Sequence, residues 1–153
     1  MKRPFLLTMI AGVAALSAAQ GVPPPDLVAM AAKARVDGQL ASWCRGQFRA
    51  GRRNAYAAAV TSAAGSGRYL VLDGDAAVVE LSPFKGTPEV QCHTPAEARK
   101  IDVAIRESEA ISGRIAPAFA TTVVCAFVED HNAVCWQYSP KTRMFVEVGG
   151  WQT

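Results

Sequence analysis

Histidines and carboxylates are the residues of this sequence whose types could perform acid–base or nucleophilic chemistry. The chain has two histidines, His93 and His131, and either could activate a nucleophile if the fold set an aspartate beside it. No G-x-S-x-G elbow is present. Asp73 and Asp75 flank Gly74, which is typical of a tight turn as well as of a carboxylate pair. An enzyme, in the form of a hydrolase that uses His93 or His131 with an aspartate, is therefore the less favoured class.

The cysteines favour structural disulfides. Cys44, Cys92, Cys125 and Cys135 allow three pairings. If a turn spans residues 129–131, Cys125 and Cys135 face each other across a hairpin at a distance that a disulfide can bridge, which leaves Cys44 to pair with Cys92. The chain has no C-x-x-C motif, and its cysteine and histidine spacings match no zinc pattern. We expect two disulfides, no metal and no cofactor.

Four arginines form a basic cluster between residues 45 and 53. Arg45, Arg49 and Arg53 are four residues apart, and Arg52 adds to them, so a helix through this segment would carry the first three on one face. Guanidinium groups bind carboxylates and phosphates through paired hydrogen bonds. Two interpretations stay open, namely a solvated helix face and a surface for an acidic partner.

An aromatic face is expected near the C-terminus, where Trp136, Tyr138 and Phe145 fall on one side of a three-stranded antiparallel meander. The same side carries Val124, Val128 and Val134, with Arg143 and Glu147 at its margins. The opposite side carries Val123, Cys125, Phe127, Cys135, Met144 and Val146. Both sides are apolar. The sheet therefore either lies between two layers, with N-terminal helices over the aromatic face, or presents that face to a partner. A slip of one residue in register would exchange the two faces.

The elements that position these residues follow from apolar spacing and turn residues. A helix over 26–35 is expected after a Pro-rich segment, with Asp26 as its cap. A second helix is predicted after Gly38, because Leu40, Trp43, Cys44, Gln47 and Phe48 have helical spacing. Strands are predicted over 55–63, 69–72, 77–81 and 89–93, with a hairpin turn at 73–74.

The second half of the chain is expected to form one helix and three strands. Thr94-Pro95-Ala96-Glu97 has the residues of a capping box, and the apolar stripe after it continues to Gly113. Strands over 121–128, 133–138 and 143–148 complete the meander. The fold class is therefore α+β, with N-terminal helices and a well-capped central helix packed on antiparallel β-meanders and joined by disulfides. A duplicated helix-plus-sheet unit is a second way to describe this layout.

The N-terminus has the pattern of a secretory signal peptide. Lys2 and Arg3 precede an apolar run over 5–16, and Ser17, Ala18 and Ala19 supply small residues for cleavage near Ala19-Gln20. The run is shorter than the roughly 20 residues that span a membrane. We expect residues 20–153 to form a single domain in the periplasm or medium, where disulfides persist. Without Lys2 and Arg3, 14 basic residues face 13 acidic ones, so the charge favours no nucleic-acid partner.

The function expected from these features is that of an exported, soluble, non-catalytic binding protein. Its contact residues would be Trp136, Tyr138 and Phe145 together with the arginines, and its partner a macromolecule of the envelope. The apolar and arginine surfaces favour an inhibitor or an envelope accessory role. Gly65-Ser66-Gly67 with Tyr69 resembles a loop of periplasmic lysozyme inhibitors, but the resemblance covers only residues 65–69 and transfers no role. The alternatives are a periplasmic protein that binds a small ligand between helix and sheet, and the hydrolase described above.

Overall fold

The computed structural model describes residues 21–49, 55–74 and 78–153. The predicted signal peptide, Asp75, Arg52 and Arg53 lie outside the described residues. The helices are α2 (Pro25–Lys33) and α3 (Pro95–Glu107). The strands are β1 (Gln39–Gly46), β2 (Ala55–Thr61), β3 (Gly67–Asp73), β4 (Val78–Phe84), β5 (Val90–His93), β6 (Ser112–Ile115), β7 (Val123–Glu129), β8 (Asn132–Ser139) and β9 (Met144–Gln152).

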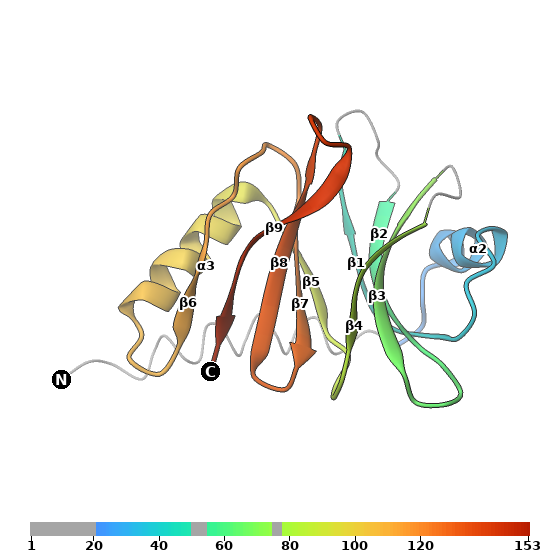
Figure 1. The fold of residues 1–153 in the computed structure, drawn as a ribbon. Coiled ribbons are helices and arrows are strands. Elements are labelled where there is room, and N and C mark those ends of the chain that lie inside the picture. The colour runs from blue at the N-terminus through green and yellow to red at the C-terminus, as the bar shows by residue number, and fades with distance from the viewer. Residues whose placement is uncertain (1–20, 50–54, 75–77) are drawn as a thin grey trace.

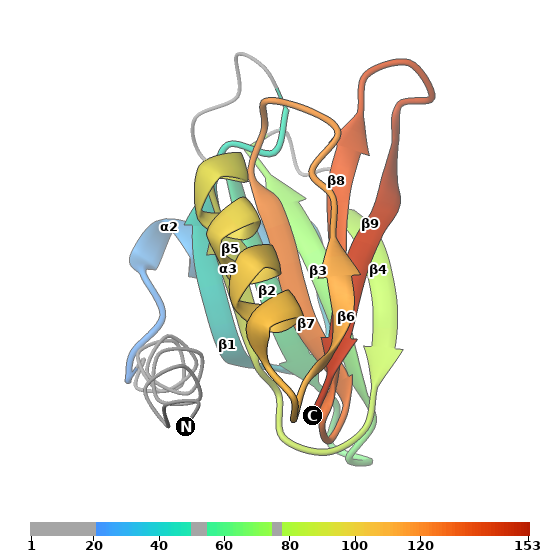
Figure 2. The same cartoon turned by 90° about the vertical axis from the view of Figure 1, so that its left-hand side faces the viewer.

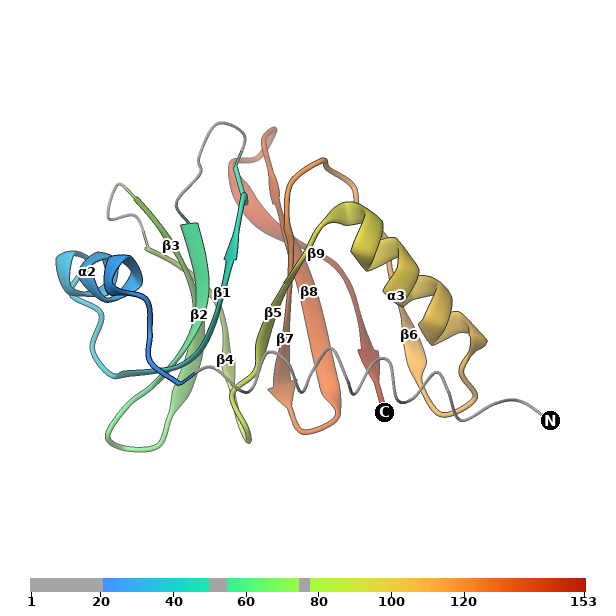
Figure 3. The same cartoon turned by 180° about the vertical axis from the view of Figure 1, so that it is seen from behind.

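These strands form two antiparallel sheets that face each other. Sheet A has the order β1-β2-β3-β4 and sheet B the order β5-β7-β8-β9-β6. Figure 1 shows α3 on the outer side of sheet B and α2 on the outer side of sheet A, and the view from behind in Figure 3 shows the same four layers. The α+β class is thus confirmed, although the described chain is mostly β and each helix covers its own sheet.

Three apolar clusters hold the layers together. The largest lies between the sheets and includes Tyr69 of sheet A and Trp136 of sheet B. A second joins α3 to sheet B through Ala98 and Ile105, and a third joins α2 to sheet A through Leu27. Both faces of each sheet are therefore buried over part of their area, which explains why most of the strand sequences are apolar on both sides.

The helix predicted after Gly38 is wrong, because residues 39–46 form β1. Trp43 belongs to the cluster under α2, whereas Cys44 packs against the cluster between the sheets and is bonded to Cys92. Neighbouring residues that point to opposite faces require the two-residue period of a strand. The helical spacing of this segment is outweighed by ladder hydrogen bonds to β2 and by the disulfide.

Both disulfide pairings are confirmed. Cys44 is bonded to Cys92 with a Cα–Cα distance of 5.6 Å, and Cys125 to Cys135 with a Cα–Cα distance of 4.0 Å. Cys125 lies directly opposite Cys135 in the β7–β8 ladder, as the hairpin argument requires. The bond from Cys44 to Cys92 links β1 of sheet A to β5 of sheet B and closes one side of the sandwich.

The capping box of α3 is confirmed, and the end of this helix is not where the sequence predicts it. Thr94 N–H donates to Glu97 Oε2 at 2.8 Å and Glu97 N–H to Thr94 Oγ1 at 3.2 Å. The helix ends at Glu107, and Gly113 lies in β6 with a φ of 151°. A side chain at residue 113 would collide with the backbone of β9, so this glycine serves strand pairing and is not a helix terminator.

Asp26 does not cap α2. Pro24 occupies the cap position and makes no side-chain hydrogen bond there. The Asp26 carboxylate instead accepts from the hydroxyl of Tyr56, with both carboxylate oxygens at 2.9 Å. This bond attaches the first turn of α2 to β2.

Candidate functional site

The aromatic face predicted from the sequence is the inner face of sheet B. Trp136 is 8% exposed and belongs to the core between the sheets, and Tyr138 and Phe145 are half-buried. The sheet does lie between two layers, but sheet A covers this face where N-terminal helices were expected. The aromatic residues therefore form no flat exposed patch.

A cavity of about 180 Å³ opens where the two sheets separate, between β4 of sheet A and β8 and β9 of sheet B. Figure 2 shows β4 and β9 on the same side of the sandwich, away from the joined strands β1 and β5. The lining residues come from four segments of the chain. They are Arg49, Val79, Glu80, Leu81, Trp136, Tyr138, Arg143, Met144 and Phe145.

Arg49 is held at this cavity by contacts with both sheets. Its Nη1 lies 3.5 Å from Oδ2 of Asp73, the buried last residue of β3. Its guanidinium carbon lies 4.7 Å from the centre of the Tyr138 ring, within the range of a cation–π contact. Phe48, the preceding residue, is buried and meets Phe145 edge to face at 6.3 Å, so the backbone at Arg49 is anchored as well.

The arginine cluster predicted on one helix face is divided by the fold. Arg45 lies in β1 and its guanidinium carbon is 5.9 Å from the centre of the Tyr56 ring. Tyr56 belongs to the cluster under α2, on the outer side of sheet A. Arg49 lies at the inter-sheet cavity instead, and Arg53 is outside the described residues. Arg45 and Arg49 therefore do not share the face that a helix would give them, because Arg45 lies in β1 and Arg49 follows the end of that strand at Gly46.

Four predicted contact residues, Arg49, Trp136, Tyr138 and Phe145, line the same cavity. The sequence reasoning missed the opposite wall, which β4 supplies through Val79 and Leu81. Their alternation in the predicted strand was a usable signal, since it sets both side chains on one face. Met144, which the register argument set on the other face of the meander, also lines the cavity and is 64% exposed.

No protein-family model, curated protein or solved structure matches this chain. The chemistry of the site therefore rests on its own geometry.

The two histidines do not line this cavity, and their described hydrogen bonds run to uncharged side chains. Nε2 of His93 is 3.0 Å from Oε1 of Gln91, whose amide donates to Glu89 Oε1 at 2.8 Å. Burial lowers the pKa of His93, although the nearby Glu97 acts in the opposite direction. Nδ1 of His131 is 3.1 Å from Oγ1 of Thr153. Within the described part of the chain, neither histidine is hydrogen-bonded to an aspartate.

The sequence also contains an S-x-x-K spacing at Ser82 and Lys85. Ser82 lies in β4, and Lys85 follows the end of that strand at Phe84. The Ser82 hydroxyl donates to the Pro83 carbonyl at 2.8 Å. The described hydrogen bond of this hydroxyl therefore runs to a backbone carbonyl and not to a base that would activate it as a nucleophile.

Two further features are absent from residues 21–49, 55–74 and 78–153. No cluster of three or more His, Cys, Asp or Glu side chains among them is arranged to hold a metal ion. No helix in these ranges is long and apolar enough to cross a membrane.

Proposed function

We propose that this chain is an exported, soluble, non-catalytic binding protein that captures a macromolecular partner of the cell envelope, as an inhibitor or an accessory factor. The observation that carries the proposal is the cavity between β4 and β8–β9. Arg49 and the aromatic residues Trp136, Tyr138 and Phe145, which come from distant parts of the chain, line it together. Partly exposed aromatic and arginine side chains around a pocket are typical of the anchoring centre of a protein interface.

The size of the cavity supports a macromolecular partner over a small ligand. Pockets for drug-sized molecules usually enclose about 300–1,000 Å³, and this cavity encloses about 180 Å³. That volume suits one side chain inserted from a larger partner. The exposed apolar side chain of Met144 at the rim adds contact area outside the cavity.

A small-ligand-binding protein remains the second candidate, because the same cavity could hold a compact molecule. The hydrolase is less supported, since the described hydrogen bonds of His93 and His131 run to Gln91 and Thr153. Nucleophilic catalysis by a Ser–His pair would need an orienting carboxylate at the histidine.

Affinity capture with matched variants tests the proposal. Tagged wild-type protein, Val79→Phe, Arg143→Glu and Arg99→Glu would be expressed in the host and crosslinked before purification. Val79→Phe adds a ring at the cavity wall, and Arg143→Glu reverses a charge in its lining. Arg99→Glu makes the same charge change on the exposed side of α3. Trp136→Ala is avoided, because truncating a core tryptophan costs about 3–5 kcal/mol of stability.

The proposal predicts one dominant partner that is retained by wild type and Arg99→Glu and lost from both cavity variants. Circular dichroism and non-reducing peptide maps would show that the cavity variants remain folded with both disulfides. Equal capture by all four proteins, or capture by none, would contradict the proposal.

A further inference from the structure

We infer that the cavity between β4 and β8–β9 recognises an aromatic side chain that has a carboxylate beside it, presented by a protein partner. The inference rests on the proposed function above and names the chemistry that the site would select. It follows from the walls of the cavity, its volume and the charges at its mouth.

The walls suit an aromatic ring. Val79 and Leu81 form the side contributed by sheet A, and Trp136 and Phe145 lie on the side of sheet B. An apolar cavity of about 150 Å³ is known to hold one benzene molecule, so about 180 Å³ accommodates a single ring with little room to spare. Tyr138 and Phe145 meet edge to face at 5.6 Å, and an inserted ring could extend this aromatic packing.

The charges in the lining select an anion next to that ring. Two guanidinium groups, from Arg49 and Arg143, line the cavity together with one carboxylate, from Glu80. Arg143 is exposed, and its backbone N–H donates to Ser139 O at 2.8 Å in the turn between β8 and β9. This turn holds the residue at the rim, where its side chain can meet an incoming carboxylate.

Arg49 is positioned in advance for the same task. Among the described residues its one ion pair is the 3.5 Å contact from Nη1 to Asp73, which is longer than the 2.7–2.9 Å of a strong charge-assisted bond. A guanidinium has five N–H donors, so this contact leaves donors for a second carboxylate. Stacking on Tyr138 restrains the planar group, so that little side-chain entropy remains to be lost on binding.

Short peptides test this chemistry without knowledge of the partner. The probes are acetyl-Gly-Gly-Phe with a free carboxylate, the same peptide as its amide, and acetyl-Gly-Glu-Phe-Gly-amide with an internal acid. Binding is followed by NMR at the tryptophan indole N–H groups, with Trp136 assigned through Trp136→Phe. Trp43 and Trp151 belong to the clusters under α2 and α3 and serve as internal references.

The inference predicts that at least one acidic peptide shifts the Trp136 signal and leaves Trp43 and Trp151 unchanged. The amide should bind at least about tenfold more weakly than the acid, which corresponds to about 1.4 kcal/mol or more. Arg143→Gln should weaken the acidic peptide and leave the amide unaffected, and Arg99→Gln should change neither. The tighter of the two acidic peptides identifies a chain terminus or an internal acid as the source of the carboxylate.

Equal binding of acid and amide, shifts at Trp43 or Trp151 alone, or no binding of any peptide would overturn the inference. The peptide and capture experiments together distinguish failure of this inference from failure of the proposed function. Partner capture that is lost in Val79→Phe, with no peptide binding, would keep the binding role and reject the aromatic–carboxylate chemistry. Peptide binding at Trp136 with no captured partner would reject the binding role and keep the chemistry of the cavity.

Discussion

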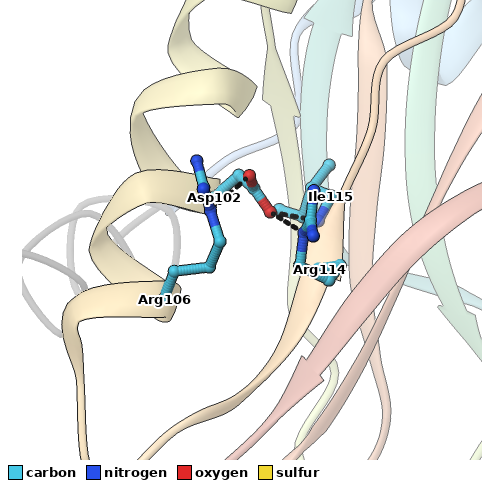
Figure 4. A network of polar contacts seen from close by, with 4 residues as sticks. All are labelled: Asp102, Arg106, Arg114 and Ile115. Carbon is cyan, nitrogen blue, oxygen red and sulfur yellow. Dashed lines mark hydrogen bonds and ion pairs between the residues drawn. The ribbon is translucent and has the colours of Figure 1, made fainter.

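The backbone N–H of Ile115 donates to Oδ1 of Asp102 at 2.8 Å, and this bond attaches edge strand β6 to α3. Asp102 is 6% exposed, and its carboxylate also meets Arg114 Nε at 3.3 Å and Arg106 Nε at 3.1 Å. Figure 4 shows the carboxylate between the helix and the strand. The free N–H and C=O groups of an exposed edge strand can pair with a strand of another chain. Here the Asp102 carboxylate accepts from one of these N–H groups, that of Ile115 in β6.

Removing this carboxylate should destabilise the fold and expose the edge of β6. Asp102→Ala leaves the Ile115 N–H without its acceptor, which we expect to cost about 1–3 kcal/mol of unfolding free energy. Concentration-dependent dimers should then appear in size-exclusion chromatography. Arg106→Gln, which removes a half-exposed member of the same network, is the control and should cost less than about 1 kcal/mol. Equal stability of Asp102→Ala and wild type would contradict this role for Asp102.

Stability should fall when the solution is made acidic, first through His93. Burial lowers the pKa of His93 in the folded protein, so below its ordinary value near 6.5 the unfolded chain binds more protons than the folded one. The free energy of unfolding should therefore decrease as the pH falls from about 7 towards the folded pKa. His93→Gln should flatten this part of the profile. If the free energy of unfolding of His93→Gln fell with pH as steeply as that of the wild type, the acid sensitivity would belong to other groups and the role of His93 would be contradicted.

Asp102 should add a second, more acidic loss of stability. Burial would raise its pKa, but the hydrogen bond from Ile115 and the charges of Arg114 and Arg106 hold the pKa below its usual value. The stabilisation is thus fully present above about pH 4 and is lost as the pH falls through the folded pKa. Asp102→Asn should remove this loss while leaving the His93 part of the profile intact. Denaturant unfolding at pH 7, 5 and 3 measures both effects.

Tyr69 should be needed for the junction between the sheets. Its hydroxyl donates to Phe127 O at 2.6 Å and accepts from Glu89 N at 3.1 Å, and burial is the main cause that raises its pKa to about 12. Tyr69→Phe keeps the ring and removes the partner of both backbone groups, so we expect a loss of about 1–3 kcal/mol. Tyr138→Phe, whose ring is half-buried at the cavity, is the matched control. A similar small loss in both variants would show that the hydroxyl of Tyr69 adds nothing.

Local signals in the sequence were sufficient where the structure is decided by neighbouring residues. Thr94 and Glu97 form the predicted capping box, because both partners lie within one turn. The pairing of Cys125 with Cys135 followed from one hairpin and its turn. The pairing of Cys44 with Cys92 followed by elimination.

Predictions from local apolar spacing were wrong where residues distant in the sequence determine the secondary structure. Residues 40–48 have helical spacing, but Gln39–Gly46 form β1, because this strand pairs with β2 and its Cys44 is bonded to Cys92. The apolar spacing that begins in α3 continues past Ser108 into β6, although the helix ends at Glu107. Gly113 belongs to β6, where a side chain would collide with the backbone of β9. The wrong helix in the first of these segments is also the reason why Arg45 and Arg49 were expected on one face. The cavity could be foreseen only in part, because its second wall is β4 of the other sheet.

The central claim is that the partner binds at the cavity between β4 and β8–β9, and site-specific photo-crosslinking in the host tests it most directly. A benzophenone amino acid would replace Met144, which lines the cavity, or Val103, which is 44% exposed on α3. The proposed function predicts a discrete adduct from position 144 that is lost when Val79→Phe is added, and no such adduct from position 103. The same adducts from both positions, or an adduct from position 103 alone, would contradict it.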